Sequence, residues 1–204
     1  PLYLIETPIL FTDLKTAELI KYAGNAFLAV KISYINQMAD LCEKVGADVH
    51  DVSRGIGLDK RIGSKFLHPG PGYGGSCFPK DTQALVKIAN YHGSNISIVE
   101  NVINYNSQRK IDMAEKIISA LGKNYSNKKI SILGLAFKPE TDDMRESPCL
   151  DIIPKLQEMK LHVSAFDPVA MDEAKKLLQN VQFTESIQDC INNSDALVIL
   201  TEWN

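Results

Sequence analysis

The residue with the clearest chemical potential is Cys77, which ends the glycine-dense stretch Gly70-Pro71-Gly72-Tyr73-Gly74-Gly75-Ser76-Cys77. Glycine adopts positive φ at little cost and lets the backbone come close to a bound group. A helical pattern resumes at Pro79, a residue favoured in a first helical turn, so Cys77 is predicted to lie beside a helix N-terminus. The macrodipole there favours the thiolate, and Lys80 adds positive charge nearby. The pattern predicts a cysteine that attacks an electrophilic carbon.

This stretch allows two other interpretations. Free cysteines are among the most buried residue types, so Cys77 could simply be a structural cysteine in a tight turn. The spacing Gly70-x-Gly72-x-x-Gly75 also matches the dinucleotide fingerprint, which needs a preceding strand and a helix directly after its last glycine. Residues 61–69 do not have a strand pattern, and residues 76–79 intervene before the helix. We therefore reject a dinucleotide site in this loop.

Three further polar residues are candidates for the same chemistry. Lys21 and Asn25 are four residues apart, so they share one face of a predicted helix. Asp81 places a carboxylate about one turn beyond the sulfur of Cys77. Spacing alone favours a lysine that reaches solvent and an asparagine that is a satisfied core amide.

The totals exclude several classes of protein. The chain has 204 residues, 45% of them hydrophobic and 23% charged, which is typical of one or two compact domains. A net charge of -3 gives no electrostatic reason to expect nucleic acid. No apolar run approaches a membrane span and no signal peptide opens the chain. The four cysteines, Cys42, Cys77, Cys149 and Cys190, lack metal-ligand spacing, so we expect reduced thiols in a cytoplasmic protein and no metal site.

The first half of the chain has a helical pattern. Asp13 is a plausible N-cap for a long helix that ends at Gly46. This helix is apolar on more than one face, so we expect it to pack within its own domain and against a second copy of the chain. A short helix over 49–57, a helix over 80–92 and a long helix over 98–121, capped by Gly122, follow.

From Lys128 the pattern becomes α/β. Strands are predicted over 130–133, 162–166 and 196–200, and helices over 171–178 and 186–192. Another helix opens at Ser147-Pro148 with Ser147 as its cap, and Pro154 should kink or break it early. Strands that alternate with helices indicate a doubly wound parallel sheet. One glycine after the first strand is too few for a dinucleotide fingerprint, so a different nucleotide, or none, is expected there.

Taken whole, the stretch from Gly70 to Asp81 resembles the catalytic-cysteine motif of the nucleotide-sugar dehydrogenases, the UDP-glucose/GDP-mannose dehydrogenase family. The similarity runs along almost the entire chain. Lys21-Tyr22-Ala23-Gly24-Asn25-Ala26-Phe27-Leu28-Ala29 is similar to the family's helix that points a lysine and an asparagine at the reacting carbon. The Pro-Gly-Tyr and Phe-Pro positions favour members that act on UDP-glucose over those that act on GDP-mannose.

The resemblance implies a division of the chain. Residues 1–14 would be the end of an N-terminal NAD-binding domain, residues 15–97 a helical dimerisation and catalytic domain, and residues 98–122 a long connecting helix. Residues 128–204 would be a Rossmann-like UDP-binding domain, truncated. Both ends look cut, since Pro1-Leu2-Tyr3 starts abruptly and the chain stops just after a strand. We therefore expect a piece of a longer protein that is inactive by itself.

The resemblance also implies an activity. UDP-glucose would be oxidised twice at C6 to UDP-glucuronate by two NAD+, through a thiohemiacetal and a thioester on Cys77. Lys21 and Asn25 would donate to oxygen, and Asp81 would orient or activate water. Lys80 and Arg145 would contact NAD, and Arg61 would reach the substrate of a neighbouring subunit. The implied substrate contacts are Arg61, Phe66, His68, Gly70, Tyr73, Gly74, Phe137 and Lys138.

Other functions stay open at this point. Arg61 could be a solvated surface charge, and residues 141–146 a charged, mobile surface loop. The enzyme could be another nucleotide-sugar dehydrogenase, or a two-electron hydroxyacid dehydrogenase that uses a lysine and an asparagine but has no need of Cys77. A non-enzymatic module that dimerises or binds a nucleotide is the third possibility. A membrane or a nucleic acid is not expected as a partner.

Overall fold

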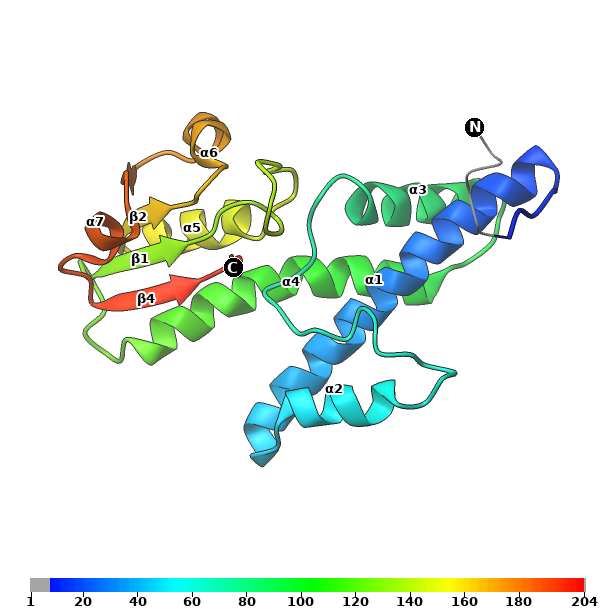
Figure 1. The fold of residues 1–204 in the computed structure, drawn as a ribbon, viewed down its shortest axis with the longest axis horizontal. Coiled ribbons are helices and arrows are strands. Elements are labelled where there is room, and N and C mark those ends of the chain that lie inside the picture. Colours follow the sequence, from blue (N-terminus) through cyan, green and yellow to red (C-terminus); the bar gives the residue numbers. More distant parts are fainter. Residues whose placement is uncertain (1–7, 204) are drawn as a thin grey trace.

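A computed structural model describes residues 8–203, so residues 1–7 of the predicted segment 1–14 lie outside the described part. A helical part and a sheet part lie along the long axis of the molecule, and α4 runs from one to the other (Figure 1). The elements in chain order are α1 (Leu14–Val45), α2 (Val49–Gly57), α3 (Phe78–Tyr91), α4 (Ser97–Ala120), β1 (Lys129–Leu133), α5 (Cys149–Glu158), β2 (His162–Phe166), α6 (Met171–Leu177), β3 (Val181–Phe183), α7 (Ile187–Ile191) and β4 (Ala196–Ile199). The α/β fold with an all-α first part is as predicted.

Helix α1 has the caps that its sequence predicted. The Asp13 side chain accepts a hydrogen bond from the Thr16 amide at 3.0 Å, and Gly46 ends the helix in the left-handed conformation with φ 73°. The helix packs against α2, α3 and α4. Its apolar residues are not all covered by these neighbours, because Ile20 and Phe27 are 50% and 64% exposed.

The sheet is parallel throughout, with the strand order β3-β2-β1-β4. Ile130 of β1 lies beside Val163 of β2 on one side and Ala196 of β4 on the other. The chain therefore leaves β1 toward one edge of the sheet and returns to its other side with β4. Between β1 and β4 the winding reverses, and ligands of open α/β sheets bind outside the carboxyl ends of the strands at such a point.

The main core lies between the sheet, α5 and the second half of α4. Its fully buried members include Ala114, Ile130, Ile132, Ile152, Ile153, Leu156 and Ala165. Because α4 contributes Ala114 to this core and also packs on α1 and α3, it joins the sheet to the helical part.

Three local predictions in the sheet part were wrong. The strand β3 was missed, because three residues are too few to show a period of two. Ser147 is not at the N-cap position of α5, which Pro148 occupies: its hydroxyl donates to the Leu135 carbonyl at 2.6 Å and accepts only a long hydrogen bond, 3.4 Å, from the Cys149 amide. The early break that was one of the two outcomes expected at Pro154 does not occur: α5 continues to Glu158, because the tertiary packing of Ile153 and Leu156 outweighs one lost hydrogen bond.

Candidate active site

Two cavities flank the segment Gly75-Ser76, which lines both. The first, here called the switch-point cavity, has a volume of about 670 Å³ and lies between the loop 65–78 and the carboxyl ends of β1 and β4. The second, here called the α3 cavity, has a volume of about 1090 Å³ and lies between α3 and the loop 141–146. The loop 65–78, here called the cysteine loop, therefore separates two spaces, each of which can hold a ligand.

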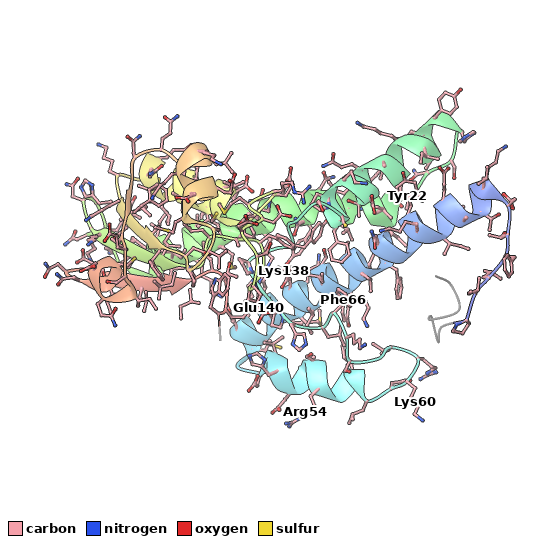
Figure 2. The ribbon with its side chains drawn as sticks, turned by 45° about the horizontal axis from the view of Figure 1, so that its top comes forward. Tyr22, Arg54, Lys60, Phe66, Lys138 and Glu140 are labelled. Atoms are coloured by element: carbon pink, nitrogen blue, oxygen red, sulfur yellow. The ribbon has the colours of Figure 1, made fainter. Side chains whose placement is uncertain are left out.

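Most of the predicted substrate contacts meet in the switch-point cavity. The cavity is lined by Phe66, His68, Gly70, Tyr73, Gly74, Phe137 and Lys138, and by Cys77 itself. Phe66 and Lys138 approach this space from the loop after α2 and the loop after β1 (Figure 2). Phe66 has φ 64°, a strained conformation for an aromatic residue, and its ring packs edge-on against Phe78 at 6.0 Å.

Arg61 is the predicted contact that the fold does not bring to this cavity. Its guanidinium lies in the loop after α2 and pairs with Asp59 at 2.6 Å, and its side chain is 90% exposed. The Asp59 side chain raises the pKa of Arg61. Within one copy of the chain Arg61 is thus a surface charge outside both cavities.

Cys77 occupies the N-cap position of α3, as predicted, and the Asp81 amide donates to the Cys77 carbonyl at 2.8 Å. Its thiol is exposed, which rules out the buried structural cysteine. The Ser76 hydroxyl lies 3.7 Å from the Cys77 sulfur. Cys42, Cys149 and Cys190 are buried, so among the four cysteines of the chain, all within the described residues, only Cys77 is exposed, and it lines the switch-point cavity.

The buried Asp81 carboxylate lies one turn along α3 from Cys77 and binds three of the predicted site residues, Lys21, Asn25 and Lys80. One of its oxygens accepts from Lys21 at 3.1 Å and from Asn25 at 2.5 Å, and the other accepts from Lys80 at 2.7 Å. Burial raises the pKa of Asp81, but the hydrogen bonds from Lys80, Lys21 and Asn25 together lower it below its usual range. Asp81 is therefore an ionised anchor that fixes Lys21 and Asn25 relative to the cysteine helix.

Glycine is required where the cysteine loop meets the sheet part. A Cβ on Gly74 would lie 2.3 Å from the Glu146 carbonyl oxygen, and a Cβ on Gly75 would lie 2.6 Å from the Phe137 ring. The Gly75 amide also donates to the Arg145 carbonyl at 2.8 Å. The glycines thus allow the backbone of this loop to pack against the segment 145–146, next to the switch-point cavity.

The loop 141–146 is held by hydrogen bonds and by a buried side chain. It is therefore not the mobile surface loop that its composition allowed. The Asp143 carbonyl accepts from the Phe137 amide at 3.1 Å, and Met144 is buried. Arg145 pairs with Asp143 at 2.7 Å, and this contact raises the pKa of Arg145. Lys80, Lys87 and Arg145 all line the α3 cavity, so the two residues predicted to contact NAD meet there.

The turn after β1 cannot accept a dinucleotide in the usual Rossmann manner. The Asp167 carboxylate at the end of β2, where such an acidic residue would hold a ribose, accepts from the backbone amides of Leu135, Ala136, Val169 and Ala170. Burial raises the pKa of Asp167, but these hydrogen bonds lower it overall. A Cβ on Gly134 would lie 2.5 Å from Thr201, so the space beside the turn is already filled.

Sequence reasoning missed the residues that β4 brings to the switch-point cavity. Leu200, Thr201 and Glu202 line it next to the loop after β1, where the Thr201 hydroxyl donates to the Ala136 carbonyl at 2.5 Å, and Lys65 lines it from the helical part. The sequence indicated only that these residues lie at the end of a predicted strand. They reach the cavity because that strand, β4, pairs with β1, and the sequence does not show which strands are neighbours.

Within residues 8–203 no helix is both long and apolar enough to cross a membrane. The same part of the chain contains no group of three or more histidine, cysteine or acidic side chains that could hold a metal ion.

Comparisons with known proteins agree on one family. Residues 15–108 match the model of the UDP-glucose/GDP-mannose dehydrogenase family, central domain, and residues 131–204 match that family's UDP binding domain. The chain is 55% identical over 204 residues to a UDP-glucose 6-dehydrogenase of Rhizobium meliloti and 49% identical over 197 residues to the UDP-glucose 6-dehydrogenase TuaD of Bacillus subtilis. These alignments cover 100% and 96% of this chain, but 47% and 42% of the relatives.

A solved structure gives the same picture in three dimensions. A UDP-glucose dehydrogenase from the archaeon Pyrobaculum islandicum superposes with a TM-score of 0.90 at 35% identity, over 99% of this chain and 47% of that one. The chain thus spans about half the length of the proteins it matches.

Proposed function

Because this chain belongs to the UDP-glucose/GDP-mannose dehydrogenase family, we propose that the protein containing it is a nucleotide-sugar 6-dehydrogenase that oxidises UDP-glucose to UDP-glucuronate. We propose UDP-glucose and not GDP-mannose as the substrate because both relatives described above are named UDP-glucose 6-dehydrogenases. The observation that carries the proposal is the exposed Cys77 thiol in the wall of the switch-point cavity, on a helix whose buried Asp81 carboxylate holds Lys21 and Asn25.

Cys77 would act after the first oxidation has converted the C6 alcohol to an aldehyde. Its sulfur adds to the aldehyde carbon, and the resulting thiohemiacetal is oxidised to a thioester. Water then hydrolyses the thioester, which releases the carboxylate and returns the proton to the thiol. Covalent attachment keeps the intermediate in position between the two oxidations.

Lys21 and Asn25 would stabilise negative charge on the C6 oxygen. Each nitrogen has N–H groups beyond the one that it gives to Asp81, and the Lys21 side chain is 60% exposed. Donors fixed in advance cost little reorganisation when the charge develops. Since both oxygens of Asp81 are occupied and its pKa is lowered, we propose that Asp81 orients these donors and does not remove a proton.

The switch-point cavity would hold the UDP moiety. Lys65 and Lys138 line it with positive charge, and the rings of Phe66 and Phe137 line it with apolar surface. A diphosphate needs the first kind of group and a uracil ring the second. This position outside the ends of β1 and β4 is where a doubly wound sheet binds its ligands.

The α3 cavity fits one end of NAD. Lys80 and Arg145 offer cationic groups there, whereas the described chain has no dinucleotide fingerprint to hold the remainder. When bound, NAD+ would supply the hydride acceptor for both oxidations. The cofactor and the sugar would then be separated only by Gly75-Ser76, the residues directly before Cys77.

A second copy of the chain would complete the assembly. Ile20, Phe27, Tyr34 and Leu41 recur every seven residues on α1, and each is about half exposed or more. An apolar stripe with this period fits the antiparallel or parallel pairing of two helices. In such a homodimer Arg61, which is exposed in one copy, would be available to the partner's site.

The test is NAD+ reduction by the full-length protein with a panel of nucleotide-sugars. We expect two NADH per UDP-glucose, and loss of the carboxylate product in Cys77→Ser. A variant Cys77→Ser that still yields two NADH would instead favour chemistry without a covalent intermediate. Activity with GDP-mannose and none with UDP-glucose would overturn the substrate assignment but leave the reaction.

A further inference from the structure

Both backbone polar groups of Gly70 are held by side chains from the two longest helices. The Gly70 amide donates to the Asn36 side-chain oxygen at 2.8 Å, and the Gly70 carbonyl accepts from Arg109 Nε at 2.7 Å. Asn36 belongs to α1 and Arg109 to α4. Gly70 lines the switch-point cavity, so these two bonds fix one wall of that cavity from outside it.

Arg109 is itself held by a second set of contacts. A terminal nitrogen of its guanidinium donates to both Asp40 oxygens, at 2.8 and 2.9 Å, while Tyr105 donates to the same carboxylate at 3.1 Å. The Arg109 side chain is only 6% exposed. A buried guanidinium stays charged and needs such partners to be tolerated. Arg109 thus spans from Asp40 on α1 to the loop, and its orientation depends on Asp40.

We propose that Arg109 is a positioning residue for nucleotide-sugar binding, acting through the Gly70 carbonyl and oriented by Asp40. The proposal rests on the function proposed above and adds a residue that lines neither cavity. Releasing the Gly70 carbonyl would free the start of the loop, where it borders the cavity. The cysteine end would stay in place, because the Asp81 amide holds the Cys77 carbonyl and the Arg145 carbonyl holds the Gly75 amide.

The expected consequence is a defect in binding and not in chemistry. In the full-length protein, Arg109→Lys keeps the charge but cannot reach Gly70 and both Asp40 oxygens in one rigid fork. We expect the KM for UDP-glucose and the Kd for UDP to rise about ten-fold, as for loss of one hydrogen bond from a charged donor. We expect kcat to change less than about three-fold. Asp40→Asn, which leaves Arg109 in place, should change the same two constants in the same direction.

The chain offers a matched control in a second ion pair between the same helices. Lys116 of α4 pairs with Glu43 of α1, and neither residue is bonded to the loop. Glu43→Gln removes the same charge from α1 as Asp40→Asn. It should leave the KM and the UDP Kd within two-fold of wild type, with circular dichroism and the melting temperature used to compare folding.

The outcomes separate the two proposals. Arg109→Lys and Asp40→Asn that fold and bind UDP as wild type does would overturn the positioning role, and so would Glu43→Gln with an equal binding defect. A fall in kcat with an unchanged KM would also overturn it. If the wild-type protein oxidises no nucleotide-sugar but binds UDP, the proposed function fails, while calorimetry with UDP still decides the role of Arg109.

Discussion

Replacing Gly74 by alanine should separate the cysteine loop from the sheet part. The added methyl carbon would lie 2.3 Å from the Glu146 carbonyl oxygen, 2.9 Å from the Glu146 carbonyl carbon and 3.2 Å from Phe137 Cβ. The first two atoms belong to the backbone, so no side-chain rotation relieves the contact. The loop or the segment around Glu146 must move, and both border the switch-point cavity or the α3 cavity.

The size of the effect follows from the kind of contact. Overpacking costs typically about 1–3 kcal/mol, and we expect the upper end, about 3 kcal/mol, because backbone opposes the methyl group. For a chain of this length that corresponds to a fall in melting temperature of roughly 6–12 °C. The UDP affinity should fall as well, since Gly74 lines the switch-point cavity.

Gly70 in the same loop provides the control. A Cβ there would meet no heavy atom within 4 Å, and neither glycine has positive φ. Gly70→Ala should therefore be neutral or stabilise by about 0.4–1 kcal/mol through the unfolded chain. Urea unfolding followed by circular dichroism measures both variants. A free energy of unfolding that differs by less than about 1 kcal/mol between them would refute the steric argument.

Three further predictions follow from burial and exposure. Asp167→Asn should lower the free energy of unfolding by about 2–3 kcal/mol at pH 7. Because folding lowers the Asp167 pKa, this difference from wild type should shrink as pH falls below about 4. Urea unfolding that gives the same difference in free energy down to pH 2 would contradict this. Iodoacetamide at pH 8 should label Cys77 in the folded protein and spare Cys149, whose pKa burial raises to about 12; peptide mass spectrometry showing equal rates would be evidence against the fold at these sites. Phe27→Glu should halve the mass measured by sedimentation equilibrium, and an unchanged mass would remove α1 as the dimer contact.

The sequence by itself determined the features that depend on neighbours along the chain. The caps at Asp13 and Gly46, the strand β1 and the place of Cys77 at the start of α3 all follow from spacing and from side-chain chemistry within a few residues. The resemblance of residues 70–81 to a catalytic motif also belongs here, because a motif is a local string.

Tertiary structure alone decided which distant residues meet. The pairing of β4 with β1 brought Glu202 to the cavity that Lys138 also lines, and the packing of α1 against α3 put Lys21 and Asn25 on the Asp81 carboxylate. Packing also allowed α5 to continue beyond Pro154, and it left Arg61 on the surface. Periodicity reports which face of an element is buried, but not which element covers it, so contacts between residues far apart in the chain are set only when the elements pack.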